Sequence, residues 1–257
     1  MRNNYHTHTF RCYHATGTEW QYVESAWRRG IETLGFSDHA PMPFPDGHQS
    51  TCRMKISLFP DYIETLLDLR ERYRGRVDIL IGLEAEYYPA VFPDFLELIR
   101  PYPIDYLILG QHFLGNETGM PYVGEPTEAE GRLSDYVDQV IEGMKTGVFS
   151  YLAHPDVAHF TGEADIYRKH MTRLCVAAKE LGLPLEYNLL GLYEHRYYPT
   201  PAFWEIAKEV GNTVILGVDA HSPAQMAEPA TVAQAKRELA ALGLVPIENL
   251  PLRPIFR

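Results

Sequence analysis

The stretch "DILIGLEAE", residues 78–86, begins as a near-continuous apolar run and ends in two carboxylates, Glu84 and Glu86. A strand that is apolar on both faces is typical of a parallel sheet that is covered by helices on both sides. In barrels built from such strands, the catalytic residues lie at the carboxyl ends of the strands. The stretch therefore predicts a buried parallel strand that carries functional carboxylates at its end.

The same pattern recurs along the chain. Short apolar, β-rich runs occur at residues 3–8, 34–39, 105–112, 148–156, 183–188 and 214–221. Amphipathic helical patterns lie between them, at residues 57–75, 127–147, 164–182, 200–211 and 229–243. This alternation predicts an α/β fold, a (β/α) barrel one unit short of eight, with an open doubly wound sheet as the structural alternative.

Local signals define some element boundaries. Thr127 and Glu130 have the spacing of a capping box, which predicts a helix start at Thr127. Thr200 and Pro201 predict the start of another helix, and Gly211 predicts its end. Residues 40–55 form the longest irregular segment, and a loop of that length after the second strand is expected to overhang the mouth of the barrel.

Bulk properties exclude several classes of protein. The chain has 257 residues, of which 46% are hydrophobic, and a formal net charge of −11, so a nucleic-acid partner is not expected. Three cysteines without a CxxC pair argue against a disulfide framework, and we expect Cys12 to be a packed residue. No apolar run approaches the roughly 20 residues that span a bilayer. A cytoplasmic protein without a membrane partner is expected.

Metal-ligand residue types stand at the ends of six of the seven predicted strands. They are His6 and His8, Asp38 and His39, Glu84 and Glu86, His112, His154, and Asp219 and His221. One histidine at a strand end is usually a satisfied polar residue, but imidazoles and carboxylates at six strand ends together indicate a metal centre.

Spacing within two of these pairs supports a shared site. Residues two apart on a strand face the same side, so His6 and His8 can chelate one ion, and so can Asp219 and His221. The last strand of a barrel closes beside the first, which brings the two pairs together. The ligand set exceeds what one four- or five-coordinate ion uses, so two or three divalent ions are expected.

In this order, the motifs resemble those of the PHP (polymerase and histidinol phosphatase) family. They are "HTHT" (6–9), "SDH" (37–39), "GLE" (82–84), "LGQH" (109–112), "AHPD" (153–156) and "VDAH" (218–221). The resemblance runs from residue 1 to about residue 225. It implies that residues 1–257 form one PHP-type domain, a distorted (β/α)7 TIM-like barrel with a trinuclear metal site at the carboxyl ends of the strands.

The resemblance also implies a distribution of the ligands. One ion is expected between His6, His8, Glu84 and Asp219, a second between Glu84, His112 and His154, and a third between His14, His39 and His221. Imidazole-rich sites suit zinc or iron, and the carboxylates also admit manganese.

Finer features resemble the histidinol-phosphate phosphatases of this family. These features are "FRCYHA" (10–15), "SDHAPMP" (37–43) and "LEYNLLGLYEHRYYPTPAF" (185–203). Arg196, in the third, is expected to clamp phosphate, because a guanidinium group matches phosphate oxygens. The "LGQH" motif and the spacing around "EHR" depart from the usual patterns of these phosphatases. These departures bear on the identity of the substrate and not on the metal site.

The expected reaction is hydrolysis of a phosphomonoester, in which a metal-bridging hydroxide held at the Glu84 site attacks phosphorus. Asp156 and His48 are candidates to protonate the leaving group, and His48 could instead contact the substrate or be a solvated loop residue. Asp38 is expected to orient a ligand histidine. Glu86 is expected either to support a ligand or to bind the substrate's ammonium group.

Other functions share parts of this pattern. A nuclease or nucleotide phosphoesterase on the same scaffold, or a generalist phosphatase, would use the same metals. A non-catalytic metal module would need only about four ligands. An amidohydrolase-type barrel also opens with "HxH" but typically has a strand-end lysine or another ligand order, and no predicted strand here ends in lysine.

Overall fold

The computed structural model describes residues 1–45, 47–226 and 228–256, and these contain a seven-stranded parallel sheet. Its strands are β1 (Asn3–Asn4), β2 (Thr33–Phe36), β3 (Asp78–Ala85), β4 (Tyr106–Leu109), β5 (Phe149–Leu152), β6 (Leu185–Asn188) and β7 (Val214–Gly217). Neighbours in the sheet follow chain order from β1 to β7, and every pair is parallel. The order never reverses, so the doubly wound alternative is wrong.

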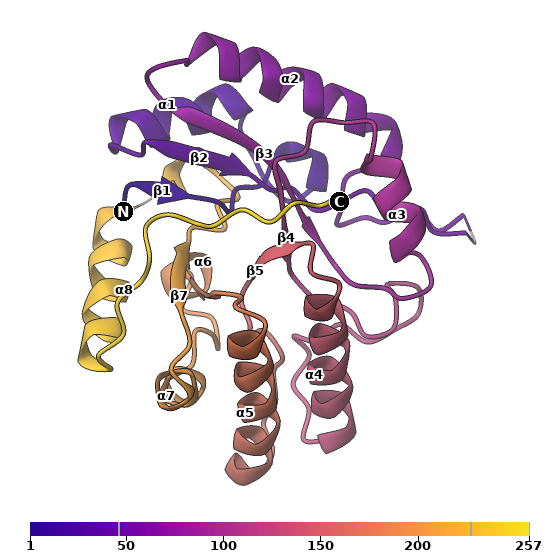
Figure 1. The fold of residues 1–257 in the computed structure, drawn as a ribbon, viewed down its shortest axis with the longest axis vertical. Coiled ribbons are helices and arrows are strands. Elements are labelled where there is room, and N and C mark those ends of the chain that lie inside the picture. The colour runs from indigo at the N-terminus through magenta and orange to yellow at the C-terminus, as the bar shows by residue number, and fades with distance from the viewer. Residues whose placement is uncertain (46, 227, 257) are drawn as a thin grey trace.

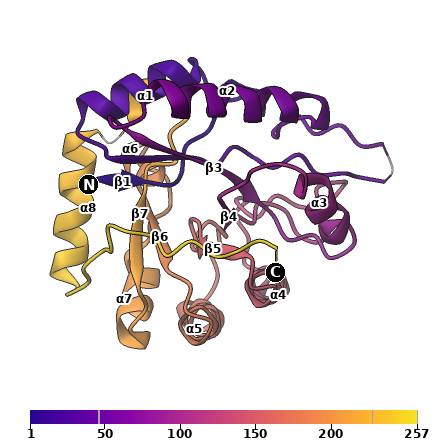
Figure 2. The same ribbon diagram turned by 45° about the horizontal axis from the view of Figure 1, so that its top comes forward.

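The first and last strands approach each other just beyond their carboxyl ends. Thr7 forms a parallel bridge with Ala220, and the amide of His8 donates to the carbonyl of Ala220 at 3.0 Å. The amide of Val218 donates to Oδ1 of Asn4 at 3.0 Å. These contacts make the sheet a nearly closed barrel and bring residues from the two ends of the chain together (Figures 1 and 2).

Helices cover the outside of the sheet (Figure 1). They are α1 (Glu19–Arg28), α2 (Phe59–Arg72), α3 (Phe92–Ile99), α4 (Glu130–Lys145), α5 (Ala164–Glu180), α6 (Leu189–Tyr193), α7 (Pro201–Val210) and α8 (Pro229–Ala241), with 3-10 turns η1 (Phe10–Cys12), η2 (Ile56–Leu58) and η3 (Pro223–Gln225). The five predicted helices are confirmed, whereas α1, α3 and α6 were not predicted. Among the described residues, no helix has the length and apolar content needed to cross a bilayer.

The predicted start of α4 is wrong. The helix begins at Glu130 behind Ala129, without a capping box. Thr127 instead lies in an extended bridge with Phe160, where its amide donates to the carbonyl of His159 at 3.0 Å. Pairing with the loop after β5 therefore satisfies the backbone of Thr127, and the helix starts three residues later.

The amino-terminal end of the barrel is filled by apolar side chains. Tyr5, Tyr106, Tyr151, Ile215 and Leu250 belong to one buried cluster, and the hydroxyl of Tyr106 donates to the carbonyl of Tyr5 at 2.7 Å. The carboxy-terminal segment runs across this end (Figure 1), where the amide of Leu250 donates to the hydroxyl of Tyr5 at 3.2 Å. In the part of the chain that the structure describes, these side chains close the amino-terminal end of the barrel and leave its carboxyl-terminal end for a ligand.

Candidate metal centre

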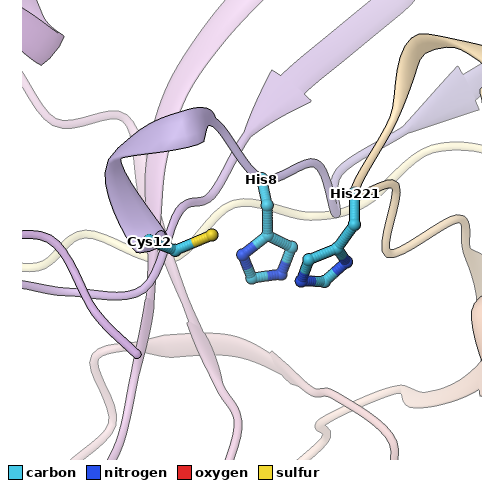
Figure 3. A group of neighbouring side chains, drawn as sticks. All are labelled: His8, Cys12 and His221. Carbon is cyan, nitrogen blue, oxygen red and sulfur yellow. The ribbon is translucent and has the colours of Figure 1, made fainter. Parts of the chain in front are cut away.

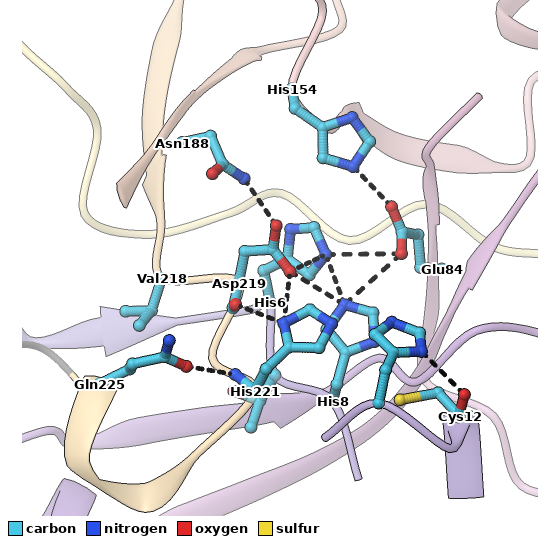
Figure 4. Close-up of polar contacts among 12 residues, drawn as sticks. His6, His8, Cys12, Glu84, His154, Asn188, Val218, Asp219, His221 and Gln225 are labelled. Carbon is cyan, nitrogen blue, oxygen red and sulfur yellow. Dashed lines mark hydrogen bonds and ion pairs between the residues drawn. The ribbon is translucent and has the colours of Figure 1, made fainter. Parts of the chain in front are cut away.

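The motif "HTH" leaves β1 in extended conformation, and its two imidazoles converge. Nε2 of His6 and Nε2 of His8 lie 3.2 Å apart. Oδ1 of Asp219 lies 3.0 Å from Nε2 of His8 and 3.5 Å from Nε2 of His6 (Figure 4). All three side chains are buried. The structure thus brings together this predicted trio from opposite ends of the chain.

Carboxylates behind these rings set their orientation. Oε1 of Glu186 lies 2.7 Å from Nδ1 of His6, and Oδ1 of Asp38 lies 3.4 Å from Nδ1 of His8. Both contacts leave Nε2 of the ring facing the cluster, which is the arrangement by which proteins orient metal-binding histidines. Asp38, which was expected to orient a ligand histidine, lies behind His8, and its Oδ1 also accepts the backbone amide of His39 at 2.8 Å.

Glu84 lies at the centre of the cluster. Its Oε1 lies 2.7 Å from Nε2 of His154, and its Oε2 lies 3.0 Å from Nδ1 of His39. Oε2 also lies 3.5 Å from Nε2 of His8 and 3.7 Å from that of His6. With His112, whose Nε2 lies 3.8 Å from Oε1, one carboxylate faces five imidazoles, which is the position expected of a bridging ligand.

A missing side chain makes room for Glu84. A Cβ atom at Gly110, directly after β4, would lie 1.9 Å from Oε1 of Glu84. Gly217 plays the same part for Glu186, because a Cβ atom there would lie 1.7 Å from its Oε1. The glycine of the unusual "LGQH" motif is thus explained by the buried carboxylate beside it.

His112 lies at the edge of the cluster. Its Nε2 is 3.8 Å from Oε1 of Glu84, and its Nδ1 is 3.4 Å from Oε1 of Glu86. Glu86 is buried and accepts the backbone amide of His112 at 3.0 Å. Of the two roles expected for Glu86, its contacts match support of a ligand.

The predicted third group also assembles. The ring of His14 lies 4.8 Å from that of His221 and 5.3 Å from that of His39. Nδ1 of His14 contacts the carbonyl of Cys12 at 2.8 Å, and Nδ1 of His221 contacts the carbonyl of Asp219 at 2.9 Å. Both rings thereby present Nε2 away from the backbone. His14 extends from the loop after η1, where strand periodicity does not act.

Several features of this cluster fit metal ions. Potential ligand atoms lie within 4.8 Å of one another in His6–His8–Asp219, His6–Glu84–His154, His8–His39–Glu84 and His14–His39–His221. Oε2 of Glu84 and Oδ1 of Asp219 are buried without hydrogen-bond partners. Each lies 3.0 Å from an imidazole nitrogen, and buried carboxylate oxygens that accept no hydrogen bond are unfavourable unless a cation or proton compensates them.

The electrostatics lead to the same conclusion. Burial lowers the pKa of His6, but the carboxylates of Glu186, Asp219 and Glu84 outweigh it and raise this pKa to about 10. Burial, reinforced by a charged His8, lowers the pKa of His221 to about 3. Without cations, protons must balance the carboxylates; divalent ions would replace those protons and neutralise the same charge.

The backbone at two of these residues is strained. His154 has φ of 27° and Asp219 has φ of 53°, in the left-handed region that favours glycine. Strain of this kind persists where the surroundings over-determine it and is concentrated at functional sites. Here it turns both side chains into the cluster.

Cys12 also lies beside the cluster, with Sγ directed toward the ring of His8 next to His221 (Figure 3). The thiol is fully buried and donates to the carbonyl of Thr9. Burial, with Asp38 nearby, raises the pKa of Cys12, which keeps the thiol neutral. This matches the packed residue expected from the sequence, and all three cysteines are unpaired.

The histidine cluster opens into a cavity of about 510 Å³, which we call the histidine cavity. Arg196 lines it from the loop after α6. Nη1 of Arg196 donates to the hydroxyl of Tyr198 at 2.8 Å, and its Nε donates to Glu194 at 2.9 Å. The predicted phosphate clamp is therefore on the wall of the same cavity as the candidate metal ligands.

Two predicted residues do not join this cavity. His48 lies beside a neighbouring pocket, where its Nε2 is 2.9 Å from Oε1 of Glu117. Asp156 is buried, accepts the amide of Thr200 at 2.7 Å and lines a separate cavity. Its position two residues beyond His154 turns its side chain toward α7, so we do not assign it the leaving-group proton.

Sequence reasoning missed the contribution of β6. Glu186 is fully buried behind His6, and Asn188 donates to Oδ2 of Asp219 at 3.1 Å (Figure 4). "LPLEYN" contains no histidine or aspartate, so this strand seemed to lack site residues. The polar residues two apart in an otherwise apolar run, Glu186 and Asn188, were the available signal.

Fold and ligand set together define a parallel α/β barrel with a candidate metal cluster at the carboxyl ends of its strands. The family model for the PHP domain matches residues 4–189. The chain belongs to the PHP family.

Relatives within the family are similar over most of their length. The chain is 32% identical over 230 residues to a probable histidinol-phosphatase of Deinococcus radiodurans, covering 86% of each chain. It is 28% identical over 249 residues to the histidinol-phosphatase of Bacillus subtilis, covering 84% of this chain and 92% of the relative.

Among solved structures, a similar fold is that of histidinol phosphate phosphatase from Lactococcus lactis, which was solved with zinc, L-histidinol and phosphate. The TM-score is 0.73 at 19% identity, covering 96% of this chain and 95% of the other. This likeness confirms the predicted barrel.

Proposed function

We propose that this protein is a metal-dependent phosphomonoester hydrolase that converts L-histidinol phosphate and water to L-histidinol and phosphate. The observation that carries the proposal is the convergence of imidazole and carboxylate ligand atoms in one cavity with Arg196. The two curated relatives, named as a probable and an assigned histidinol-phosphatase, support the choice of substrate.

The cluster would hold two or three divalent ions, of zinc, manganese or iron. The proposed ligands are His6, His8, Glu84 and Asp219 for one ion, Glu84, His112 and His154 for the next, and His14, His39 and His221 for the third. Zinc in the Lactococcus lactis structure supports the metal type. When bound, such ions lower the pKa of water to near neutrality and stabilise charge on phosphate oxygens.

The chain's own residues would position the reactants. Glu186 and Asp38 hold the rings of His6 and His8 from behind, so the ligand nitrogens face the cavity without reorganisation. Arg196, braced by Tyr198 and Glu194, would pair with the non-bridging oxygens of the phosphate. Because Glu194 and Tyr198 already occupy part of the guanidinium, its remaining donors are pre-oriented.

We expect a small phosphate ester as the only substrate class, in the cytoplasm and without a nucleic-acid or membrane partner. The net charge of −11 supports this, because a polyanion would be repelled. A mononucleotide remains small enough for a cavity of about 510 Å³, so it belongs in the test.

The test is phosphate release by metal-loaded protein from histidinol phosphate, nucleoside monophosphates and sugar phosphates. A clear kcat/KM advantage for histidinol phosphate is expected. Equal rates on all esters would leave a generalist phosphatase, and no release from any of them would refute the proposal.

Variants separate the metal and phosphate roles. His6→Ala and Glu84→Ala should each lower metal content per chain, measured by elemental analysis. Arg196→Ala should raise KM at unchanged metal content, because its guanidinium contacts no candidate ligand. Arg100→Ala, at the exposed end of α3, is the matched control and should change neither quantity. Full metal content in both ligand variants would contradict the proposed centre.

A further inference from the structure

Arg53 is a buried arginine on the wall of the histidine cavity that the sequence did not single out. It lies in the long loop of residues 40–55 and is 2% exposed. Its Nε donates to Oε2 of Glu117 at 2.5 Å, and its Nη2 donates to Oε1 of Glu86 at 2.6 Å. The guanidinium thus joins this loop to the end of β3 and to the loop after β4.

One nitrogen of this guanidinium lacks a partner. Nη1 is buried and makes no hydrogen bond, although Nε and Nη2 are both paired with carboxylates. An unsatisfied buried donor on a charged group is unfavourable, so native structures rarely keep one without a reason. Arg53 shares the cavity with His112 and Arg196, so a ligand held there would be close to it.

The charges around Arg53 limit what this ligand group is. Two carboxylates face one guanidinium, Glu86 at 2.6 Å from Nη2 and Glu117 at 2.5 Å from Nε. A third anion at Nη1 would be repelled by them, whereas a neutral acceptor would not. His48 contacts the far side of this group, at Oε1 of Glu117.

In the proposed function, the metal cluster and Arg196 hold the phosphate end of the substrate. The acceptor for Nη1 must therefore come from the leaving alcohol. Among neutral acceptors, the unprotonated nitrogen of an azole ring offers one lone pair in the ring plane, which suits a planar guanidinium donor.

We propose that Nη1 of Arg53 donates a hydrogen bond to a neutral ring nitrogen of the leaving alcohol, which makes Arg53 the residue that selects the leaving group. This inference rests on the proposed phosphatase function and adds the chemistry by which the alcohol is recognised. The Glu86 and Glu117 carboxylates fix the guanidinium so that only Nη1 is available.

The test compares two substrates that differ only in the ring, histidinol phosphate and 2-amino-3-phenylpropyl phosphate. The wild-type enzyme should prefer the imidazole by about ten- to hundredfold in kcat/KM, since the phenyl ring leaves Nη1 unpaired. Arg53→Lys should reduce kcat/KM for histidinol phosphate by a similar factor and leave the phenyl ester within about threefold, so the preference disappears.

Two arginine controls separate this role from others. Arg196→Lys should slow both esters by the same factor, because both carry phosphate. Arg100→Lys, on the exposed end of α3, should slow neither. An equal loss for both esters in Arg53→Lys would mean that Arg53 only supports the loops, and an unchanged preference would also overturn the proposal. If Arg53→Lys fails to fold, the wild-type enzyme still tests the proposal, because equal rates on the two esters would overturn it.

A binding measurement distinguishes this inference from the proposed function. Calorimetry with the alcohols L-histidinol and phenylalaninol on metal-loaded protein reports the subsite without catalysis. Tighter binding of histidinol that Arg53→Lys abolishes supports the inference even if no ester is hydrolysed. Equal binding of the two alcohols counts against it, whatever the hydrolytic activity.

Discussion

At the scale of single residues, the site depends on carboxylates that stand behind the ligand histidines. Glu186 contacts Nδ1 of His6, accepts the amide of His154 and accepts an amide proton of Asn188. One buried side chain therefore orients several members of the cluster without being a proposed ligand itself. Residues in this position are typically worth 10- to 100-fold in metal affinity.

Glu186→Gln tests this role. The amide keeps the size of the side chain but loses the charge that supports His6, so zinc affinity should fall by about 10- to 100-fold. A competition titration against a chromophoric chelator measures it. Glu209→Gln, on an exposed ion pair with Arg168, is the control and should bind zinc as the wild type does. Wild-type affinity in Glu186→Gln would show that the contact to His6 is incidental.

Asp156 makes a pH-dependent contribution to stability. Burial raises its pKa from 3.8 to about 7 in the folded chain. Between these pH values the folded state holds a proton that the unfolded state has lost, so stability falls as pH rises from about 4 to about 7. The loss of stability is complete above the pKa of Asp156 in the folded chain and absent below its pKa in the unfolded chain.

Asp156→Asn should remove this dependence. The amide oxygen can still accept the amide of Thr200, and no charge is buried. Relative to wild type, the variant should gain stability on the order of a few kcal/mol between pH 4.5 and pH 8. Urea unfolding at several pH values measures it, with metal content checked at each. A difference between the two proteins that is constant with pH would contradict the assignment.

At the scale of elements, short strands deliver side chains and glycines clear space for them. β4 ends at Leu109, and Gly110 follows at the point where Glu84 enters from β3. Any residue with a side chain at position 110 would collide with the carboxylate of Glu84. The pairing of β3 with β4 therefore determines the centre of the cluster as much as Glu84 does.

Gly110→Ala should displace the Glu84 carboxylate, because the new Cβ would lie 1.9 Å from Oε1. We expect loss of bound metal and of phosphate release by more than about tenfold, since Glu84 faces five imidazoles. Gly131→Ala is the matched control: its Cβ meets nothing within 4 Å in α4, and it should raise helix stability by up to about 1 kcal/mol. Full metal content in Gly110→Ala would show that the carboxylate has another position.

At the scale of the whole molecule, the cluster joins the first and the last strand of the barrel. His6 and His8 precede α1, whereas Asp219 and His221 follow β7. Outside this contact, the edges β1 and β7 share no strand ladder in the described residues, and the bridge between Thr7 and Ala220 is isolated. Bound ions would therefore act as cross-links between β1 and β7, where the sheet has no continuous ladder.

Removal of the ions by a chelator should loosen the contact between β1 and β7 before the rest of the sheet. Hydrogen exchange at residues 5–9 and 218–222 should accelerate by at least about tenfold, because each cross-link lost raises local opening. Exchange in β3 and β4 should change much less. Re-addition of zinc should restore protection, and uniform acceleration over all strands would indicate global unfolding instead.

The sequence predicted the strands more completely than it predicted the helices and their first residues. Seven apolar runs predicted the seven strands, because a parallel strand buried on both faces must be apolar throughout. α1 was not predicted, although Tyr22, Val23 and Ala26 lie at helical spacing in it. The start at Thr127 was wrong because a tertiary bridge competes with a local cap.

The sequence by itself determined the strand pattern and the types of residue at the strand ends, since burial and ligand chemistry act on each residue separately. Only the tertiary structure decided which side chains meet: Glu84 with five imidazoles, Glu186 behind His6, and Arg53 with one unpaired nitrogen beside the cavity. These contacts join residues far apart in the chain. Their geometry depends on sheet register and on space left by Gly110 and Gly217, which no local pattern records.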